Sequence, residues 1–557
     1  MFKKNTKHLQ PALISAASEL PENQRERLEA SWAGTFYREF FCRINEDIFS
    51  VLYSEQPSRP NVPVNVLVGL EALKAGFGWS DEELYEAFLY NLQVRYALGY
   101  DRLGDGEFDL RTLYYFRQRL SEHNLKTGQN LLEKAFEQIT DAQITELKVK
   151  TGQQRMDSTH IASNIVGASR LQLVVEAIRR AQRMLNEADQ LRLSELFAPY
   201  LKDSAGHYTY RVKGKEATQA HLQQAGAVLY AVLQEMRPGY AEHEMYPVLE
   251  RLFNENFHVS GENVRPRQNQ ELPAGSLQSL DDVEATYRTK GARHYKGYVA
   301  NVTETCDPQN HVQLITQVQV ASNHTEDSHL LKDALPNLKE RTQLDTLITD
   351  GAYPSETNDE ELRKHEVRLI QTGIRGKKAN PKLFNLSDFQ VEQDENGHPT
   401  FLACPNGQST LATRGRTSFR WFARFQAEAC SACPFQLDKR CRARPQKRDP
   451  RYFIYFTPAE VHVAQRRKDH LAHKHNEHNL RAAVEATVRS IKHPFPAGKL
   501  PVRGKFRMTC MMISSATLVN VRRIWRYEIE KALFWPLLAF RKLASRRLLP
   551  ASLMVSP

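Results

Sequence analysis

The sequence lacks the features of a membrane or secreted protein. Over its 557 residues no apolar run approaches the roughly 20 residues of a membrane-spanning helix, and the apolar segment 532–540 is short and contains Pro536. The opening Met-Phe-Lys-Lys-Asn is not followed by the apolar core of a signal peptide. Cysteine is scarce, with seven residues spread over the chain, which favours a reducing compartment. We therefore expect a cytoplasmic protein without a membrane partner.

The composition is that of a large basic globular protein. Hydrophobic residues make up 41% of the chain and charged residues 25%, and the formal net charge is +11. A chain of this length is expected to form about two or three folding units. The positive charge favours a polyanionic partner, although a merely basic protein would show the same excess.

The N-terminal part has helical patterns. Residues 63–75 are apolar at helical spacing, and Ser80-x-x-Glu83 is a capping box that begins a helix running toward Gly99. A third helix is expected over 110–120. Its expected exposed arginines are Arg111, Arg117 and Arg119. Two helices and a turn before an arginine-bearing helix fit a DNA-binding helix-turn-helix, and a plain helical bundle is the equal alternative.

Strand patterns begin near Lys148. The expected strands end at Asp157 and Asp350, and others cover 298–303, 312–320 and 366–372. This order fits a five-stranded mixed sheet with helices on both faces. Between its first two strands lies a long insertion with amphipathic helices expected over 174–191 and 217–236.

Three acids stand out by their positions. Asp157 and Asp350 each follow a strand-like run, and Glu485 lies in the spacing Arg481-x3-Glu485-x6-Lys492. On a helix those last three side chains fall within a stripe roughly 40° wide. Each acid also has an ordinary reading: a helix cap, a turn, and a surface ion pair, respectively. Taken together, carboxylates flanked by cations indicate a site that handles metal and phosphate.

These segments carry a family resemblance. Asp157-Ser-Thr, Thr349-Asp-Gly-Ala-Tyr353 and the Arg481–Lys492 spacing resemble the catalytic motifs of bacterial insertion-sequence DDE transposases. Residues 63–120 look like the family's N-terminal helical domain, and 290–298 looks like the segment before its second core strand. The resemblance implies an α/β fold with a ribonuclease H-like mixed-sheet core, as in retroviral integrases.

The resemblance also implies a chemistry. Asp157 would bridge two Mg²⁺ (or Mn²⁺) ions, Asp350 would hold one of them and Glu485 the other. Carboxylate oxygens are the ligands that such hard cations prefer. Water would first free a 3′ hydroxyl at the transposon end, and that hydroxyl would then attack target DNA. The expected partners are double-stranded DNA of transposon ends and target, and a second copy of the chain in a synaptic homodimer.

Four further residues are expected at the DNA. Arg481 and Lys492 would hold backbone phosphate beside the cut. Three residues before the arginine, where the family signature usually has tyrosine, this chain has His478, which would project from the same helix edge. Tyr353 would stack on a base near the transposon end, with a role as a core aromatic as its alternative.

A cysteine cluster lies between Asp350 and Glu485. Its members are Cys404, Cys430, Cys433 and Cys441. One C-x2-C pair with two single cysteines can form a structural zinc site, and a similar pattern recurs in one branch of the family. Four buried free thiols are the alternative.

The expected organisation follows from these patterns. The expected units are an N-terminal helical DNA-binding domain (1–140), a catalytic core (145–395 and 455–530), a helical insertion (168–280), a small cysteine-rich zinc-binding insertion (396–452) and a basic tail (531–557). Three functions remain open: a transposase that cuts and joins DNA, an inactive or domesticated DNA-binding relic, and a metal-dependent nuclease that does not join strands.

Overall fold

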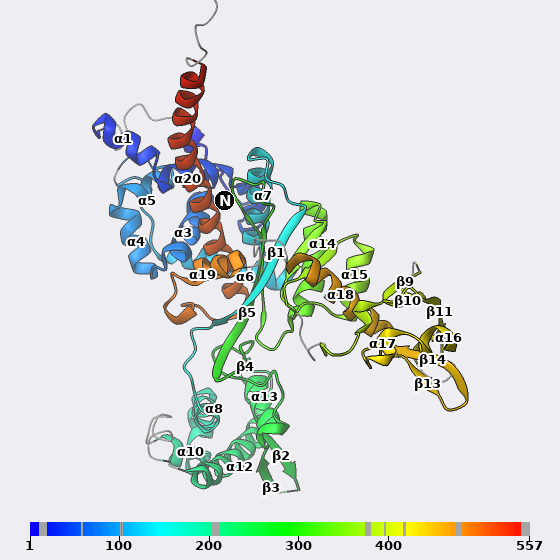
Figure 1. The fold of residues 1–557 in the computed structure, drawn as a ribbon. Coiled ribbons are helices and arrows are strands. Elements are labelled where there is room, and N and C mark those ends of the chain that lie inside the picture. The colour runs from blue at the N-terminus through cyan, green and yellow to red at the C-terminus, as the bar shows by residue number, and fades with distance from the viewer. Residues whose placement is uncertain are drawn as a thin grey trace, which may run out of the picture.

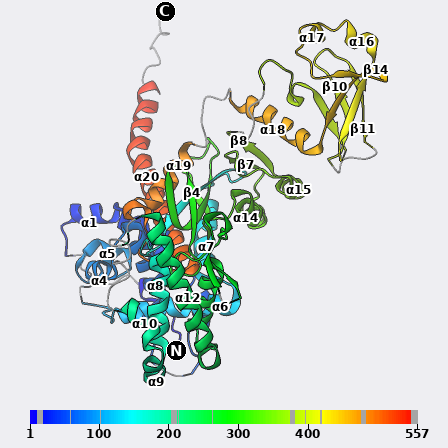
Figure 2. The ribbon, with the colours of Figure 1, turned by 90° about the horizontal axis from the view of Figure 1, so that it is seen from below.

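The computed structural model describes most of the chain. It leaves out residues 10–18, 57–58, 101, 103, 202–211, 213, 262, 374–379, 395–396, 416–418, 475–481 and 547–557, and of 473, 474, 482 and 533–546 it describes the backbone alone. Figures 1 and 2 show a central sheet flanked by an N-terminal helical region, a second helical lobe and a separate β-rich lobe. Among the described helices, none has the length and apolar content that would let it cross a membrane.

The central sheet is mixed, as the sequence predicts, but it has six strands instead of the expected five. Its strands are β1 (Gln153–Ala162), β4 (Thr286–Lys290), β5 (Arg293–Thr305), β6 (Ile315–Ser322), β7 (Thr346–Thr349) and β8 (Arg368–Gln371). The order is β4-β5-β1-β7-β8, with β6 also paired to β5. Strand β1 runs antiparallel to β5 and parallel to β7, and β7 runs parallel to β8. The early strand is longer than expected, so Asp157 lies within β1 rather than at its end.

Helices cover both faces of this sheet. Side chains alternate along β1, so its apolar residues lie on both faces and each face packs against helices. Met156 packs with Leu335 on one face, and Ile161 packs with Ile491 and Met512 on the other. The helices involved are α14 (Asp327–Thr342) and α15 (Glu356–Lys364) on the first face, and α19 (Ala482–Lys492) and α20 (Lys505–Arg546) on the second. A short 3-10 turn, η6 (Pro496–Gly498), joins α19 to α20.

The N-terminal region is helical, as expected. Its elements are η1 (Lys7–Leu9), α1 (Glu22–Glu29), α2 (Trp32–Glu39), η2 (Phe41–Arg43), η3 (Glu46–Leu52), α3 (Val64–Phe77), α4 (Asp81–Tyr90), α5 (Leu92–Ala97), α6 (Arg111–Thr127) and α7 (Leu131–Glu146). The Ser80–Glu83 capping box is present, but the helix toward Gly99 is divided at Asn91, whose side chain caps α5. Helix α20 packs directly on α3, where a Cβ at Gly76 would meet Leu518 at 2.0 Å. Residues 531–546 continue α20 instead of forming a separate tail.

Between β1 and β4 the chain forms the second helical lobe (Figure 1). Its elements are α8 (Arg170–Met184), α9 (Glu187–Arg192), α10 (Ser194–Leu201), α12 (Lys215–Tyr240), α13 (Tyr246–Asn256), β2 (Phe257–Ser260), β3 (Asn263–Pro266) and η4 (Asn269–Glu271). Helices α8 and α12 bury a core of their own, which includes Val174, Ile178 and Leu229. The expected long helix over 174–191 is interrupted at Leu185, and α9 begins after the Asn186 cap.

The β-rich lobe is larger than the cysteine-rich insertion expected from the sequence. Its elements are η5 (Leu386–Asp388), β9 (Gln390–Gln393), β10 (Pro399–Ala403), β11 (Ser409–Arg414), β12 (Trp421–Phe425), α16 (Ala427–Ser431), α17 (Pro434–Leu437), β13 (Arg444–Gln446), β14 (Asp449–Phe456) and α18 (Pro458–Lys474). The six strands form one sheet in the order β13-β14-β12-β11-β10-β9. Helix α18 leads from this lobe back to β8 of the central sheet.

Candidate active site

Two of the predicted acids lie on neighbouring parallel strands. In the pairing of β1 with β7, Gln153 is opposite Thr346 and Arg155 is opposite Ile348. Continuing this register by two residues brings Asp157 level with Asp350, the first residue after β7. Residues at the same level of adjacent parallel strands point to the same face, with the strands about 4.8 Å apart. The topology therefore makes Asp157 and Asp350 neighbours on one face of the sheet.

The carboxylates of Asp157 and Asp350 lie where strand β7 ends. Beyond Thr349 strand β7 stops, whereas β1 continues to Ala162 because β5 pairs with it along the other edge. Asp157 remains 9% exposed and Asp350 is half-buried. One carboxylate oxygen of Asp350, Oδ1, accepts a hydrogen bond of 2.8 Å from the Ala352 backbone amide, which orients this side chain.

Helix α19 lies across β1 and β5 with its apolar face on the sheet. The buried residues of this face are Val484, Thr487, Val488 and Ile491. Thr487 donates from Oγ1 to Glu304 Oε2 of β5 at 2.7 Å, and Lys492 donates from Nζ to Thr159 Oγ1 of β1 at 2.9 Å. One edge of α19 is therefore attached to β5 and the other to β1.

Glu485 lies on the β1 edge of α19. At about 100° per residue, Glu485 and Lys492 share one edge, and Thr487 lies toward the other. Glu485 is exposed, and together with Lys492 it lines a shallow pocket of about 370 Å³. Thr159, the partner of Lys492, is two residues beyond Asp157 and so lies on the same face of β1. The edge that carries Glu485 therefore faces the strand that carries Asp157.

This donor set has the chemistry that a hard divalent cation requires, because all three side chains offer carboxylate oxygens. In the described part of the chain, no three His, Cys, Asp or Glu side chains converge closely enough to hold a metal ion. Asp157 and Asp350 are an adjacent pair by strand register, and Glu485 lies on the edge of α19 that faces β1.

Of the residues expected to contact DNA beside Glu485, the structure describes Lys492 alone. Arg481 and His478 lie outside the described residues. Lys492 is half-buried, which lowers the pKa of its ammonium group, and it also donates to the His160 carbonyl oxygen at 2.9 Å.

Tyr353 is a core residue, and its expected role in stacking on DNA is wrong for this structure. The side chain is 0% exposed, and its hydroxyl donates to Asn301 Oδ1 at 2.8 Å. Burial, followed by the nearby carboxylates of Asp327 and Asp157, raises its pKa well above the usual value. The Tyr353 ring belongs to the hydrophobic core between the sheet and α14, where it is not accessible to a DNA base.

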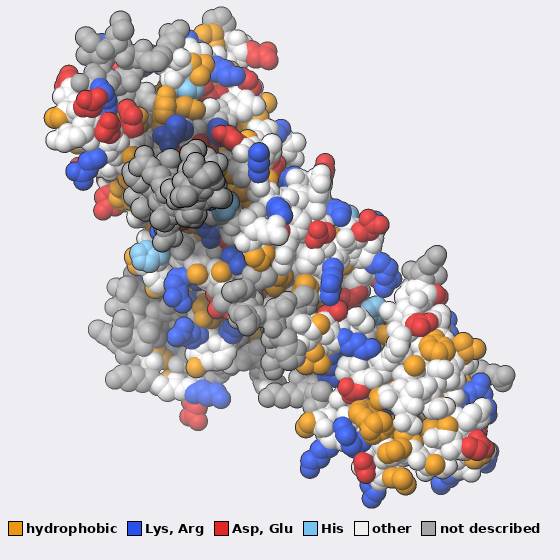
Figure 3. Space-filling model, turned by 45° about the horizontal axis from the view of Figure 1, so that its top comes forward, with side chains coloured by type: hydrophobic (Ala, Val, Ile, Leu, Met, Phe, Trp, Pro, Cys, Tyr) orange, Lys and Arg blue, Asp and Glu red, His pale blue; other side chains and the backbone are white. Residues whose placement is uncertain are grey.

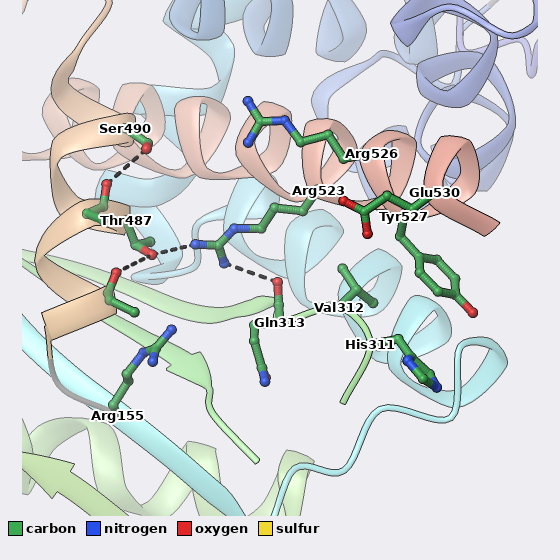
Figure 4. Close-up of a pocket in the computed structure, with 12 residues that line it drawn as sticks. Arg155, His311, Val312, Gln313, Thr487, Ser490, Arg523, Arg526, Tyr527 and Glu530 are labelled. Carbon is green, nitrogen blue, oxygen red and sulfur yellow. Dashed lines mark hydrogen bonds between the residues drawn. The ribbon is translucent and has the colours of Figure 1, made fainter. Parts of the chain in front are cut away.

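A buried charged network behind α19 was not found by sequence reasoning. Glu304 is 0% exposed and lies between two arginines: Arg155 donates from Nε to Oε1 at 2.6 Å, and Arg523 donates from Nη1 to Oε2 at 2.7 Å. Arg523 also donates to the Thr487 hydroxyl and to the Gln313 carbonyl oxygen (Figure 4). This network joins β1, β5, α19 and α20 at one point. The available signal was Glu304, a lone acid directly after the uncharged run 297–303.

The arginines expected on α6 are only partly available for DNA. Arg117 is half-buried, donating from Nε to Glu71 and from Nη2 to Asp81, both at 2.7 Å. Lys74 also pairs with Asp81, at 2.6 Å. Arg117 therefore joins α3, α4 and α6 within the helical region, whereas Arg111 and Arg119 are exposed as expected.

The four clustered cysteines line one small pocket of the β-rich lobe. Cys430 and Cys441 belong to its hydrophobic core, and Cys404 packs against that core. Burial, followed by the neighbouring thiols, raises the pKa of Cys430 to about 11, which favours the protonated form. Since the described residues contain no group of three metal ligands, the structure does not support the expected zinc site. None of these four cysteines forms a disulfide; Cys430, Cys433 and Cys441 are buried and Cys404 is partly exposed.

Comparison with protein families identifies two parts of the chain. A model described as "Transposase domain (DUF772)" matches residues 26–119, from α1 to α6. A model described as "Transposase DDE domain" matches residues 403–525, which contain Glu485 and most of the β-rich lobe. Together, these two matches indicate an insertion-sequence DDE transposase. No curated protein and no solved structure matches it.

As a DDE transposase, the chain is a DNA-transposing enzyme, and family membership implies dependence on a divalent metal ion, Mg²⁺ or Mn²⁺. In sequence, the strands of the central sheet lie between the two matched regions. In space, α20 connects these regions through its contacts with α3 and β6. The transposase therefore has its family-defining segments packed around the sheet that carries Asp157 and Asp350.

Proposed function

We propose that this transposase cleaves DNA at the terminal inverted repeats of an insertion sequence and joins the freed 3′ ends to target DNA. The parallel register that sets Asp157 level with Asp350 is the observation that carries the proposal. Strand β1 lies beside β7, and α19 packs across β1, which is the arrangement expected of a ribonuclease H-like core.

Asp157, Asp350 and Glu485 would hold two divalent ions. When bound, such ions activate a nucleophile and neutralise charge on the attacking and leaving oxygens. The protein's own contribution is positioning: the strands hold two carboxylates on a rigid sheet, and α19 presents the third. Lys492, fixed by Thr159, would add positive charge for a backbone phosphate.

The other units have supporting roles in this proposal. The N-terminal helices would bind transposon-end DNA through exposed side chains such as Arg111 and Arg119. Two copies of the chain would hold two ends in a synaptic complex, in the cytoplasm and on the nucleoid. The region after β8 adds the β-rich lobe to the catalytic core, and the second helical lobe extends from the β1–β4 connection.

The test is a paired-end cleavage and strand-transfer assay with Asp157→Asn, Asp350→Asn and Glu485→Gln. Each variant keeps the side-chain size and removes one negative ligand, so we expect cleavage to fall by at least about 10²-fold. Binding of transposon-end DNA in a gel-shift assay should change by less than about threefold, because less than 1 kcal/mol of contact is lost.

Two variants serve as controls. Asp333→Asn changes an exposed acid on α14, and Ser490→Ala changes an exposed residue on the other edge of α19. Both should retain full cleavage. Substantial cleavage by an acid variant would remove that residue from the site. Products that are cut but never joined would favour the nuclease, and a wild-type protein that binds ends without cutting them would favour the relic.

A further inference from the structure

The sheet of the β-rich lobe has one covered face and one open face. The covered face packs on η5 and on the helices α16 to α18 through its hydrophobic core. Its strand residues include Leu402, Ala423, Phe425, Ile454 and Phe456. Because side chains alternate along a strand, the intervening residues lie on the opposite face. An antiparallel sheet with one solvated face normally carries polar residues there.

The open face carries aromatic and apolar side chains instead. Cross-strand pairs place Phe401 beside Leu411, Thr413 beside Phe422, Phe422 beside Tyr455, and Arg424 beside Phe453. We call this set, together with Arg444, the outer face. Leu411 is 71% exposed and Tyr455 is 45% exposed, whereas Phe453 is only 8% exposed. Figure 3 shows hydrophobic side chains on the surface of this lobe, with Lys and Arg around them. Apolar surface gathered in this way marks a binding site.

The aromatic rings of the outer face form a preorganised group. The rings of Phe453 and Tyr455 are stacked, with centroids 6.1 Å apart and an interplanar angle of 12°. Phe422 lies 6.1 Å from each of them. The Arg424 guanidinium lies 5.4 Å from the Phe422 ring centroid, and Gln446 donates to the Tyr455 hydroxyl. A ligand with flat rings would meet side chains that are already ordered.

The charge around this face is strongly positive. Residues 399–456 contain eleven Lys and Arg against three Asp and Glu, an excess of eight in a chain whose net charge is +11. Of the described acids here, Asp449 is paired with Arg451 at 2.6 Å. In the strand register Arg444 is opposite Phe453, and its guanidinium donates to the Ala443 carbonyl oxygen at 2.8 Å. Arg442 contacts the Tyr455 carbonyl oxygen at 3.4 Å and pairs with Glu460 at 3.9 Å. The combination of aromatic rings and an excess of positive charge favours a polyanion that carries flat rings.

We propose that the outer face binds single-stranded DNA. Exposed aromatic rings bind unpaired bases by stacking, and arginines contact the phosphates and the base faces. A duplex hides the faces of its bases, and among the described residues of this lobe no helix projects from this sheet face to enter a groove. The site lies on a different unit from Asp157 and Asp350, and its binding can be measured without cleavage. Its failure would therefore leave the proposed transposition chemistry untouched.

The experiment uses the full chain with Asp350→Asn, so that the DNA stays intact. Fluorescence anisotropy would measure binding of a thymidine oligonucleotide of about 12 residues and of a duplex of the same length. In this background, Tyr455→Ala and Arg424→Ala should each weaken single-strand binding by roughly 5- to 150-fold, the range measured for loss of one stacked base. Duplex binding should remain unchanged.

Two further variants separate stacking from folding. Tyr455→Phe keeps the ring and should bind the single strand as the parent does. Leu437→Ala removes a 69% exposed side chain from α17, which packs on the covered side, and should have no effect. Arg424→Ala should also reduce the slope of log affinity against log salt by about 0.7.

Three results would overturn the proposal. One is single-strand binding that is unchanged in Tyr455→Ala. Another is an equal loss of single-strand and duplex binding. The third is a change in oligomeric state by light scattering without loss of single-strand binding, which would make the outer face a contact between copies of the chain.

Discussion

Glu304 is expected to hold the helix that carries Glu485 in place. In Glu304→Gln the side-chain volume is kept, but Arg155 and Arg523 lose the negative charge between them. Arg155 is only 8% exposed at its side chain and Arg523 is 21% exposed, so water cannot replace the carboxylate fully. Removing one partner of a buried ion pair costs about 3–5 kcal/mol. At about 2–4 °C per kcal/mol, the melting temperature should fall by roughly 6–20 °C.

The same substitution should also slow cleavage, because the single amide oxygen of glutamine cannot accept from Arg155, Arg523 and Thr487 together, which weakens the attachment of α19 to β5. Below both melting temperatures, we expect the single-turnover cleavage rate to fall by about 10- to 100-fold, the usual effect of losing a group that orients a metal ligand. Affinity for transposon-end DNA should not change. This difference between rate and affinity separates a positioning role from a general loss of folded protein.

The matched control is Glu528→Gln on α20. Glu528 also pairs with an arginine, Arg38 at 3.0 Å, but its side chain is 35% exposed. An ion pair of this kind contributes at most about 1 kcal/mol. If Glu304→Gln were no less stable than Glu528→Gln, or if it lost stability while cleaving DNA at the wild-type rate, the positioning role would be refuted.

Two other predictions concern buried groups. Tyr353→Phe removes the donor to Asn301, so the free energy of unfolding should fall by about 1–3 kcal/mol in urea denaturation while DNA affinity stays constant; a selective loss of DNA binding would restore the stacking role. Burial and the neighbouring Glu137 raise the pKa of Glu133 from 4.5 to about 7. The folded state therefore binds this proton more tightly than the unfolded state, and the stabilising contribution present below pH 4.5 is lost as the pH rises through 7. Glu133→Gln should accordingly be more stable than wild type near pH 8, by about 1–3 kcal/mol, with a smaller difference near pH 5. Equal stability at both pH values would contradict the shift.

Several predictions from the sequence depended on short-range patterns, and these agree best with the structure. The Ser80–Glu83 capping box marks the start of α4, because the two residues satisfy each other's backbone amides locally. The β-branched run before Asp350 forms β7, and the apolar stripe beside Glu485 forms the buried face of α19. In each case the decisive interactions lie within a few residues of one another.

Other features depend on distant parts of the chain. Asp157 lies inside β1 because β5, more than a hundred residues later, extends the pairing to Ala162. Arg117 has the pattern of an exposed arginine but is paired with Glu71 and Asp81. The six-stranded sheet of the β-rich lobe was missed because its strands are short and its cysteine spacing suggested a metal-centred insertion.

The sequence by itself determined which residue types were available: acids after strand-like runs, a helix with Glu485 and Lys492 on one edge, and a family signature. Local hydrogen bonding and side-chain periodicity are sufficient for these features. Tertiary structure decided which side chains meet and which are buried. It made Asp157 and Asp350 neighbours through a parallel register, buried Tyr353, and placed Glu304 between two arginines. These outcomes depend on strand pairing and on desolvation by distant segments, which no local pattern records.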